Sequence, residues 1–209
     1  MTDIRDWEKQ RYYVPEAVLL QIREIENNPS VQRLPEKVRT LRTNKLQLHK
    51  QGREAALFCY GLGRALSTKI YFANYEQSDY DFVACWKDQD SLAFASVQLK
   101  EVTPDSINTK SSLQEEINKL SKYSCSKDLA VAIFLNKRCK TDFSDIKIPI
   151  LNIAELWIFG SISSDQSKWF IYGDMLKTPQ FVEFDYPEGA ELAKIDKTAS
   201  SVANSDLYK

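Results

Sequence analysis

Histidine and closely spaced cysteines are scarce in this sequence. His49 is the only histidine, and the four cysteines lie far apart with no Cys-x-x-Cys pair. Zinc ribbons, iron–sulfur clusters and His-based zinc sites need such ligands at short spacing, so none is expected. A Ser-His or Cys-His nucleophilic system would depend on His49. That residue falls in a basic helical stretch, and we expect it at the surface.

Long hydrophobic runs are also missing. The first ten residues, "MTDIRDWEKQ", are charged and contain no apolar segment of the kind that a signal peptide carries. No apolar run reaches the length of a membrane span. The expectations are therefore a cytoplasmic protein with no membrane partner, whose Cys59 and Cys85 are reduced core residues.

Glycine is limited to six residues, and the stretch "YGLGRALSTK" holds two of them. A phosphate-binding P-loop follows a strand and ends in Gly-Lys-Ser/Thr. Here the lysine comes after Ser67 and Thr68, and the preceding residues have a helical pattern. The glycines are therefore interpreted as close-packing positions within a helix.

The chain has 209 residues, 43% of them hydrophobic, which is enough for one core with an appendage. We predict three parts: a partly basic helical extension at 1–50, an α/β core at 51–187, and a polar, flexible tail at 188–209. The fold class expected is α/β, with a mixed central sheet flanked by helices.

Hydrophobic periodicity predicts the elements of that fold. Helices are predicted over 15–27, over a stretch from "LPEK" to Leu66 that is either one helix or two with a break near Gly52, over "SSLQEEINKLSKYS", and as a short helix over "AELWIFG". Strands are predicted over "TKIYFANYE", "SDYDFVACW", "SLAFASVQLKEV", "LAVAIFLN", "IPILNI" and "KWFIYGDML", the second and third being antiparallel because the connection between them is short.

Polar residues gather on the predicted hairpin. Gln98 and Lys100 lie two apart on the third strand, so both point to one face while Val97 and Leu99 point to the other. Asp81, at the start of the second strand, can sit beside Gln98 across the ladder, and Glu54 of the preceding helix could lean over the same place. A polar sheet surface is the alternative interpretation of these residues.

Such a cluster fits phosphodiester hydrolysis. Mg²⁺ takes oxygen ligands, usually one or two carboxylates. Asp81 and Glu54 can supply carboxylates, Gln98 an amide oxygen, and Leu99 a backbone carbonyl. Lys100 would orient or help to deprotonate the attacking water, or stabilise the charge of the transition state.

The order of these residues resembles the PD-(D/E)xK nuclease superfamily, the restriction-endonuclease-like fold. The resemblance covers about 53–136 and is carried by "GREAALF", "SDYDFVA" and "VQLKEV", followed by "EEINKLSKY" and "LAVAIFLN". It implies that Glu54 is the helix acid, Asp81 a metal ligand, Gln98 the third motif position and Lys100 the motif lysine. The implied cofactor is Mg²⁺ or Mn²⁺, with Asp81, Gln98 and Glu54 as its ligands.

Two positions depart from the family pattern. Tyr80 stands where proline usually precedes the aspartate, and Gln98 replaces an acid. Some active members of the superfamily tolerate glutamine at this position, although a neutral ligand weakens Mg²⁺ binding. Asp79 and Glu101 are candidate substitute acids; Glu101 points away from Lys100 unless a bulge re-aims it.

Basic residues precede Glu54 and would lie beside the proposed site. Between 31 and 53 there are seven basic residues and one acid, a pattern that suits phosphate contacts. The candidates for nucleic-acid binding are Arg39, Arg42, Lys45, Lys50 and Arg53. The expected function is Mg²⁺-dependent endonuclease cleavage of DNA, with duplex DNA as the expected substrate and a homodimer among the expected states, since nucleases that cut both strands are commonly dimers. The alternative is a catalytically inactive module of the same fold that binds nucleic acid or a protein partner.

Overall fold

A single mixed β-sheet forms the centre of the molecule in the computed structural model, which describes residues 4–123, 126–137 and 141–189. Its seven strands follow one another in space in the order of the sequence. They are β1 (Ile70–Ala73), β2 (Phe82–Asp88), β3 (Ser91–Val102), β4 (Ser126–Leu135), β5 (Ile153–Ser161), β6 (Lys168–Gly173) and β7 (Gln180–Asp185). The α/β class with a mixed sheet is therefore confirmed.

Both kinds of strand pairing occur in this sheet. The pairs β3–β4 and β4–β5 are parallel, and all other neighbours are antiparallel. The predicted hairpin of β2 and β3 is confirmed, with Phe82 opposite Val97. The chain passes from β3 to the parallel β4 through the helix α6 (Leu113–Lys119), as parallel pairing requires a crossover.

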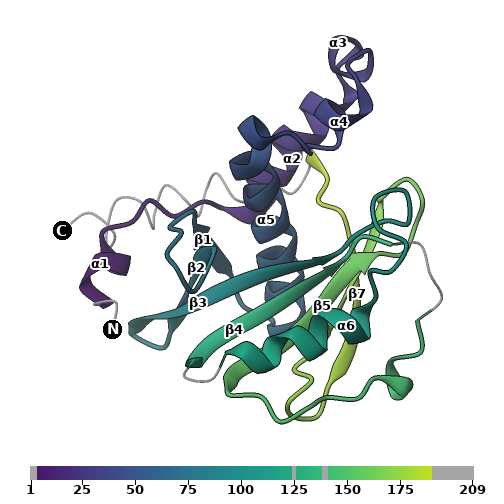
Figure 1. Ribbon diagram of the computed structural model, residues 1–209. Coiled ribbons are helices and arrows are strands. Elements are labelled where there is room, and N and C mark those ends of the chain that lie inside the picture. Colours follow the sequence, from purple (N-terminus) through teal and green to yellow (C-terminus); the bar gives the residue numbers. More distant parts are fainter. Residues whose placement is uncertain (1–3, 124–125, 138–140, 190–209) are drawn as a thin grey trace.

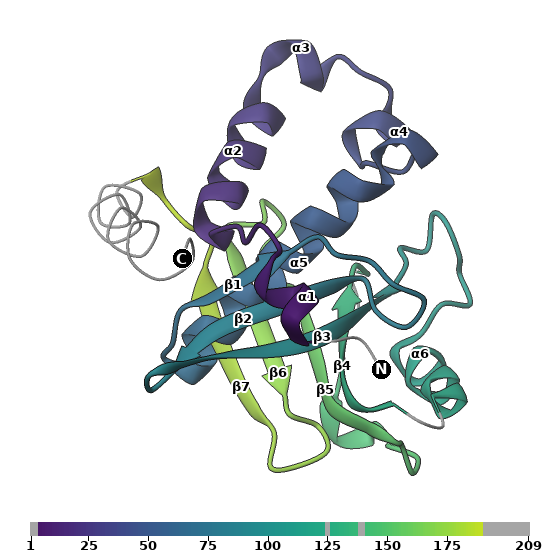
Figure 2. The ribbon, with the colours of Figure 1, turned by 90° about the vertical axis from the view of Figure 1, so that its left-hand side faces the viewer.

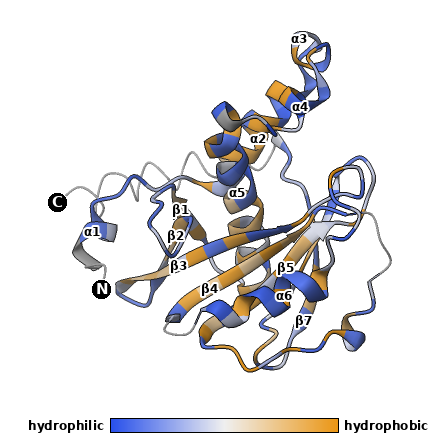
Figure 3. Ribbon diagram, viewed as in Figure 1, coloured by the Kyte–Doolittle hydropathy of each residue, from blue (hydrophilic) through white to orange (hydrophobic). Residues whose placement is uncertain are grey.

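Helices cover the two faces of the sheet (Figures 1 and 2). The helix α5 (Gln47–Leu66) packs on one face and α6 on the other. Leu57 and Phe58 of α5 are fully buried, and Phe58 packs against Phe82 and Phe159 of the sheet. Figure 3 shows the strands as mostly hydrophobic and α6 as strongly hydrophilic on its solvent side. The core therefore has two layers, one on each face of the sheet.

Close contact between α5 and the last strand explains one glycine. A Cβ atom built on Gly61 would lie 2.6 Å from the Phe184 ring of β7, a distance at which atoms overlap. The helix can approach β7 only because this position has no side chain. At its end, Ser67 takes a left-handed conformation, and its backbone N–H donates to the Gly63 carbonyl.

The remaining helices form an N-terminal extension. They are α1 (Ile4–Glu8), α2 (Pro15–Asn27), α3 (Pro29–Gln32) and α4 (Glu36–Arg39), followed by the 3-10 helix η1 (Asn44–Leu46). The segment 28–46, which we call the arm, projects away from the sheet beyond α2 and the start of α5 (Figures 1 and 2). In the part of the chain that the structure describes, no helix is long and apolar enough to cross a membrane.

Three sequence-based assignments are wrong. The break in the second helical stretch lies at 40–46 rather than near Gly52, which is buried within α5. The segment "AELWIFG" is part of β5 instead of a helix, and "IPILNI" is extended chain without strand pairing until Ile153. A helix and a strand buried on both sides have the same apolar run, so periodicity could not separate them. The predicted tail at 188–209 lies outside the described residues from 190 onward.

The contact between α5 and the sheet yields a test of stability. Replacing Phe58 by alanine should lower the free energy of unfolding by about 3–5 kcal/mol, because it removes a buried ring and leaves a cavity. Urea denaturation measures this difference. Leu92→Ala at the exposed tip of the β2–β3 hairpin should cost less than about 1 kcal/mol; equal losses in the two variants would contradict the assigned core.

Candidate active site

The carboxylate of Asp81 lies where β2 and β3 stop pairing. The backbone N–H of Asp81 donates to the Val97 carbonyl at 2.9 Å, and its side chain then turns toward β3. There Asp81 Oδ2 accepts the Leu99 backbone N–H at 2.6 Å. The carboxylate takes the place of a backbone acceptor at the end of the ladder, and this fixes it beside the middle of β3.

Two side-chain amides also donate to this carboxylate. Gln98 Nε2 hydrogen-bonds Asp81 Oδ2, and it also donates to the Leu99 carbonyl at 3.3 Å. Gln51 Nε2, from α5, donates to Asp81 Oδ1 at 3.2 Å. The structure thus brings together Asp81 and Gln98, as the sequence led us to expect, and adds Gln51.

Lys100 lies on the same face of β3 as Gln98 and is half-buried. Its ammonium is 5.9 Å from the centre of the Tyr123 ring. Burial lowers the pKa of Lys100, while the charges of Asp81 and Glu116 act in the opposite direction. A lysine with a lowered pKa gives up its proton more readily than an exposed one, which suits proton transfer.

The opposite face of β3 holds a separate ionic cluster. Glu101 accepts hydrogen bonds from Arg42 at 2.7 Å, from Asn136 at 2.7 Å, and from Lys50. Burial by itself raises the pKa of Glu101, but the hydrogen bonds from Lys50, Asn136 and Arg42 bring it below its usual value. Glu101 is therefore an ionised, fully engaged acid, and it lies away from Lys100.

Glu54 belongs to this second cluster. It is 5% exposed, and Lys50 Nζ lies 3.7 Å from its carboxylate. Burial raises the pKa of Glu54 to about 7; Lys50 lowers it and the Glu101 charge raises it. The structure therefore divides the four predicted site residues: Asp81, Gln98 and Lys100 lie together, whereas Glu54 contacts the Lys50–Glu101 pair.

Gln51 and Tyr123 are site residues that the sequence did not reveal. Gln51 lies three residues before Glu54, on the same side of α5, so helical spacing was the one available signal. Tyr123 donates its hydroxyl to Gln98 Oε1 at 3.3 Å. Asp79, a candidate substitute acid, is exposed in the turn before β2.

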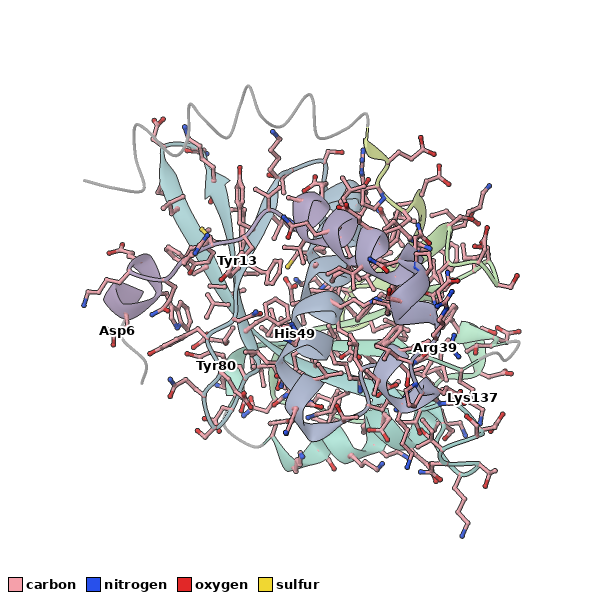
Figure 4. All side chains as sticks on the ribbon, turned by 90° about the horizontal axis from the view of Figure 1, so that it is seen from above. Asp6, Tyr13, Arg39, His49, Tyr80 and Lys137 are labelled. Carbon is pink, nitrogen blue, oxygen red and sulfur yellow. The ribbon has the colours of Figure 1, made fainter. Side chains whose placement is uncertain are left out.

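The predicted phosphate contacts also fall into two groups. Arg42 and Lys50 pair with Glu101, and Arg53 pairs with Glu26 at 3.5 Å. Arg39 and Lys45 are exposed on the arm, together with Arg33 and Lys37. Figure 4, which looks down on the molecule, places Arg39 on the opposite side of His49 from Tyr80, the neighbour of Asp81. The exposed positive charge therefore belongs to the arm, and the other three cations hold the fold together.

The oxygen atoms at Asp81 suit a hard cation in type. The carboxylate and the Leu99 carbonyl are ligands that Mg²⁺ prefers. The Gln98 amide oxygen is a third of this type, but it faces Tyr123 and would have to turn toward Asp81. Their combined charge is only −1. Across the described ranges, no three His, Cys, Asp or Glu side chains group so that they could hold a metal ion. Any metal here would therefore depend on amide and backbone oxygens as well as on Asp81.

The fold and site define an α/β protein with an Asp–Gln–Lys cluster on a β-hairpin. Comparison with known proteins identifies no family for it: the chain matches no family model, no curated protein and no solved structure.

The buried Glu54 gives a prediction about pH. The pKa of Glu54 is raised from 4.5 to about 7, so between these pH values the folded protein binds more protons than the unfolded chain. Stability should therefore fall as the pH rises through this window, by about 3 kcal/mol from this residue. Glu54→Gln should remove this dependence.

Urea unfolding of the wild type and of Glu54→Gln at pH 4.5 to 7.5 measures the difference. Glu115→Gln, at an exposed position of α6, is the matched control and should keep the wild-type pH dependence. Parallel curves for the wild type and Glu54→Gln would contradict the account of this residue.

Proposed function

We propose that this protein is a Mg²⁺-dependent nuclease of the restriction-endonuclease-like fold that hydrolyses phosphodiester bonds in DNA. The observation that carries the proposal is the contact of Asp81 with Gln98 and with the Leu99 backbone, on the same face as Lys100. The arrangement of the sheet adds support, because the β2–β3 hairpin, the helix α6 and the parallel strand β4 follow in the order that the resemblance implies.

Each residue has a role in this proposal. Asp81, the Leu99 carbonyl and the Gln98 amide oxygen would hold Mg²⁺, which when bound polarises the phosphate and offsets the developing charge. Gln51 orients the Asp81 carboxylate through its hydrogen bond to Oδ1. Lys100, with its lowered pKa, orients the attacking water and accepts or returns its proton. Glu54 is left out of the ligand set because it contacts Lys50.

The charge on the arm supports DNA as the substrate. Arg33, Lys37, Arg39 and Lys45 are exposed there, and lysine and arginine side chains bind the phosphate backbone without regard to sequence. A duplex held by the arm would be contacted on its backbone, which leaves the choice of target to other groups.

A second candidate function is a catalytically inactive module of this fold that binds nucleic acid or a protein partner. The observation that favours it is that three N–H groups already satisfy the Asp81 carboxylate without a metal. Titration calorimetry separates the two. Salt-dependent DNA binding with no uptake of Mg²⁺ would support the inactive module.

Lys100→Ala should slow cleavage by about 100- to 10,000-fold, because the variant lacks the proposed proton-transfer group. Cleavage of plasmid, linear duplex, single-stranded DNA and RNA is followed with Mg²⁺ and with Mn²⁺. Lys87→Ala, an exposed lysine on the same hairpin, is the matched control and should cut at the wild-type rate. Equal cleavage rates for the two variants, or no cleavage of any substrate by the wild type, would contradict the nuclease proposal.

Removing Arg39 or Lys45 should weaken DNA binding at any sequence. Each lost phosphate contact should reduce the slope of log K against log salt concentration by about 0.9. Fluorescence anisotropy of labelled duplex without divalent metal measures both quantities. Lys69→Ala, exposed beyond the other end of α5, should bind as the wild type does; an unchanged slope in the arm variants would remove the arm from the interface.

A further inference from the structure

Tyr123, which follows α6 in the chain, contacts Gln98 of the candidate site. It follows the 3-10 helix η2 (Leu120–Lys122), and its hydroxyl lies 3.3 Å from Gln98 Oε1. Its ring lies near the ammonium groups of both Lys100 and Lys122, at 5.9 and 5.2 Å from the ring centre. The chemistry proposed above assigns no role to this phenol, although it touches two of the three central residues.

The surroundings of Gln98 fix which way its amide faces. An ionised carboxylate only accepts hydrogen bonds, and Asp81 Oδ2 already receives the Leu99 N–H at 2.6 Å. Gln98 must therefore turn its nitrogen toward Asp81. Its oxygen then faces the Tyr123 hydroxyl, which donates to it.

Lys122 fixes the direction of the Tyr123 hydroxyl. The Lys122 ammonium lies 5.2 Å from the centre of the Tyr123 ring; because an ammonium group can only donate, it favours a phenol oxygen that turns its lone pairs toward Lys122. The O–H is then left to donate to Gln98.

Binding a cation at Asp81 requires the opposite orientation of the amide. A cation takes the oxygen of Gln98, so the amide must rotate and point its nitrogen at the Tyr123 hydroxyl. The phenol oxygen would then have to accept from the amide while the Lys122 ammonium, which only donates, stands beside the same ring. The hydrogen bond from Tyr123 to Gln98 is lost in this rotation.

We propose that Tyr123 is a positioning residue that holds the Gln98 amide with its nitrogen toward Asp81 and so weakens divalent-cation binding at this site. The inference rests on the proposed function, since it assumes that Gln98 turns its oxygen to the cation. In this arrangement a neutral glutamine keeps Asp81 satisfied without a metal, and the tyrosine sets how readily the cation displaces it.

Tyr123→Phe keeps the ring and removes only the hydroxyl. Titration calorimetry with MgCl₂ should show that this variant binds Mg²⁺ about two- to tenfold more tightly than the wild type, the effect of one hydrogen bond. Tyr172→Phe is the matched control, because Tyr172 is half-buried on β6 and stacks on Phe143. It should leave the Mg²⁺ affinity unchanged.

A metal-free readout tests the same contact. In the NMR spectrum of the ¹⁵N-labelled protein, the side-chain amide of Gln98 is assigned by its disappearance in Gln98→Glu. Its protons should exchange with water faster in Tyr123→Phe than in the wild type or in Tyr172→Phe, because the amide is no longer held at both ends.

The outcomes separate the two proposals. Mg²⁺ binding of equal strength in the wild type and Tyr123→Phe, with unchanged amide exchange, would overturn the role of Tyr123 and leave the nuclease proposal standing. An equal gain in Tyr172→Phe would overturn it as well. An absence of Mg²⁺ binding in every variant would overturn both proposals.

Discussion

The hydrogen bond from the Leu99 backbone to Asp81 is the interaction on which the candidate site depends. It forms where β2 and β3 stop pairing, and it places a side-chain oxygen where a strand would normally supply a carbonyl. The neighbouring β3 residues are then fixed by the pleat: Val97 and Leu99 are buried against α5, and Gln98 and Lys100 face α6. The three central residues, Asp81, Gln98 and Lys100, are therefore placed by the hairpin itself, and Gln51 and Tyr123 contact them from neighbouring elements.

The same alternation along β3 separates two kinds of polar chemistry. Asp81, at the edge of the hairpin, is satisfied by neutral donors from both β3 and α5, and Lys100 lies nearby on the α6 side with a lowered pKa. On the α5 side, Glu101 is held by two cations and an amide. Arg42 belongs to the arm, so its ion pair with Glu101 also ties the arm to the strand that carries Lys100. We infer that the second cluster serves the structure, and that the reactive groups are those on the first.

The sequence predicted the hairpin and the strand β4 well, because alternating and continuous apolar runs define them. The prediction of a helix at β5 was wrong, because an apolar run buried on both faces has no period that separates a strand from a helix. The strand β7 was not predicted, because most of its residues are exposed and it has no apolar run. Asp81 and Gln98 could be paired from the strand register. Helical spacing from Glu54 was the one signal for Gln51. The Tyr123–Gln98 contact, the ion pairs of Arg42 and Lys50 with Glu101, and that of Arg53 with Glu26 join residues far apart in the chain, so spacing along the sequence could not reveal them.

The most direct test of the central claim is the position of a divalent cation in a crystal. Mn²⁺ soaked into crystals of the wild-type protein serves as an anomalous scatterer in place of Mg²⁺. We expect a peak bonded to the Asp81 carboxylate, with the Gln98 amide rotated so that its oxygen faces the ion. A peak at the Glu54–Glu101 cluster in place of Asp81, or none at Asp81 at a concentration that saturates binding in solution, would contradict it.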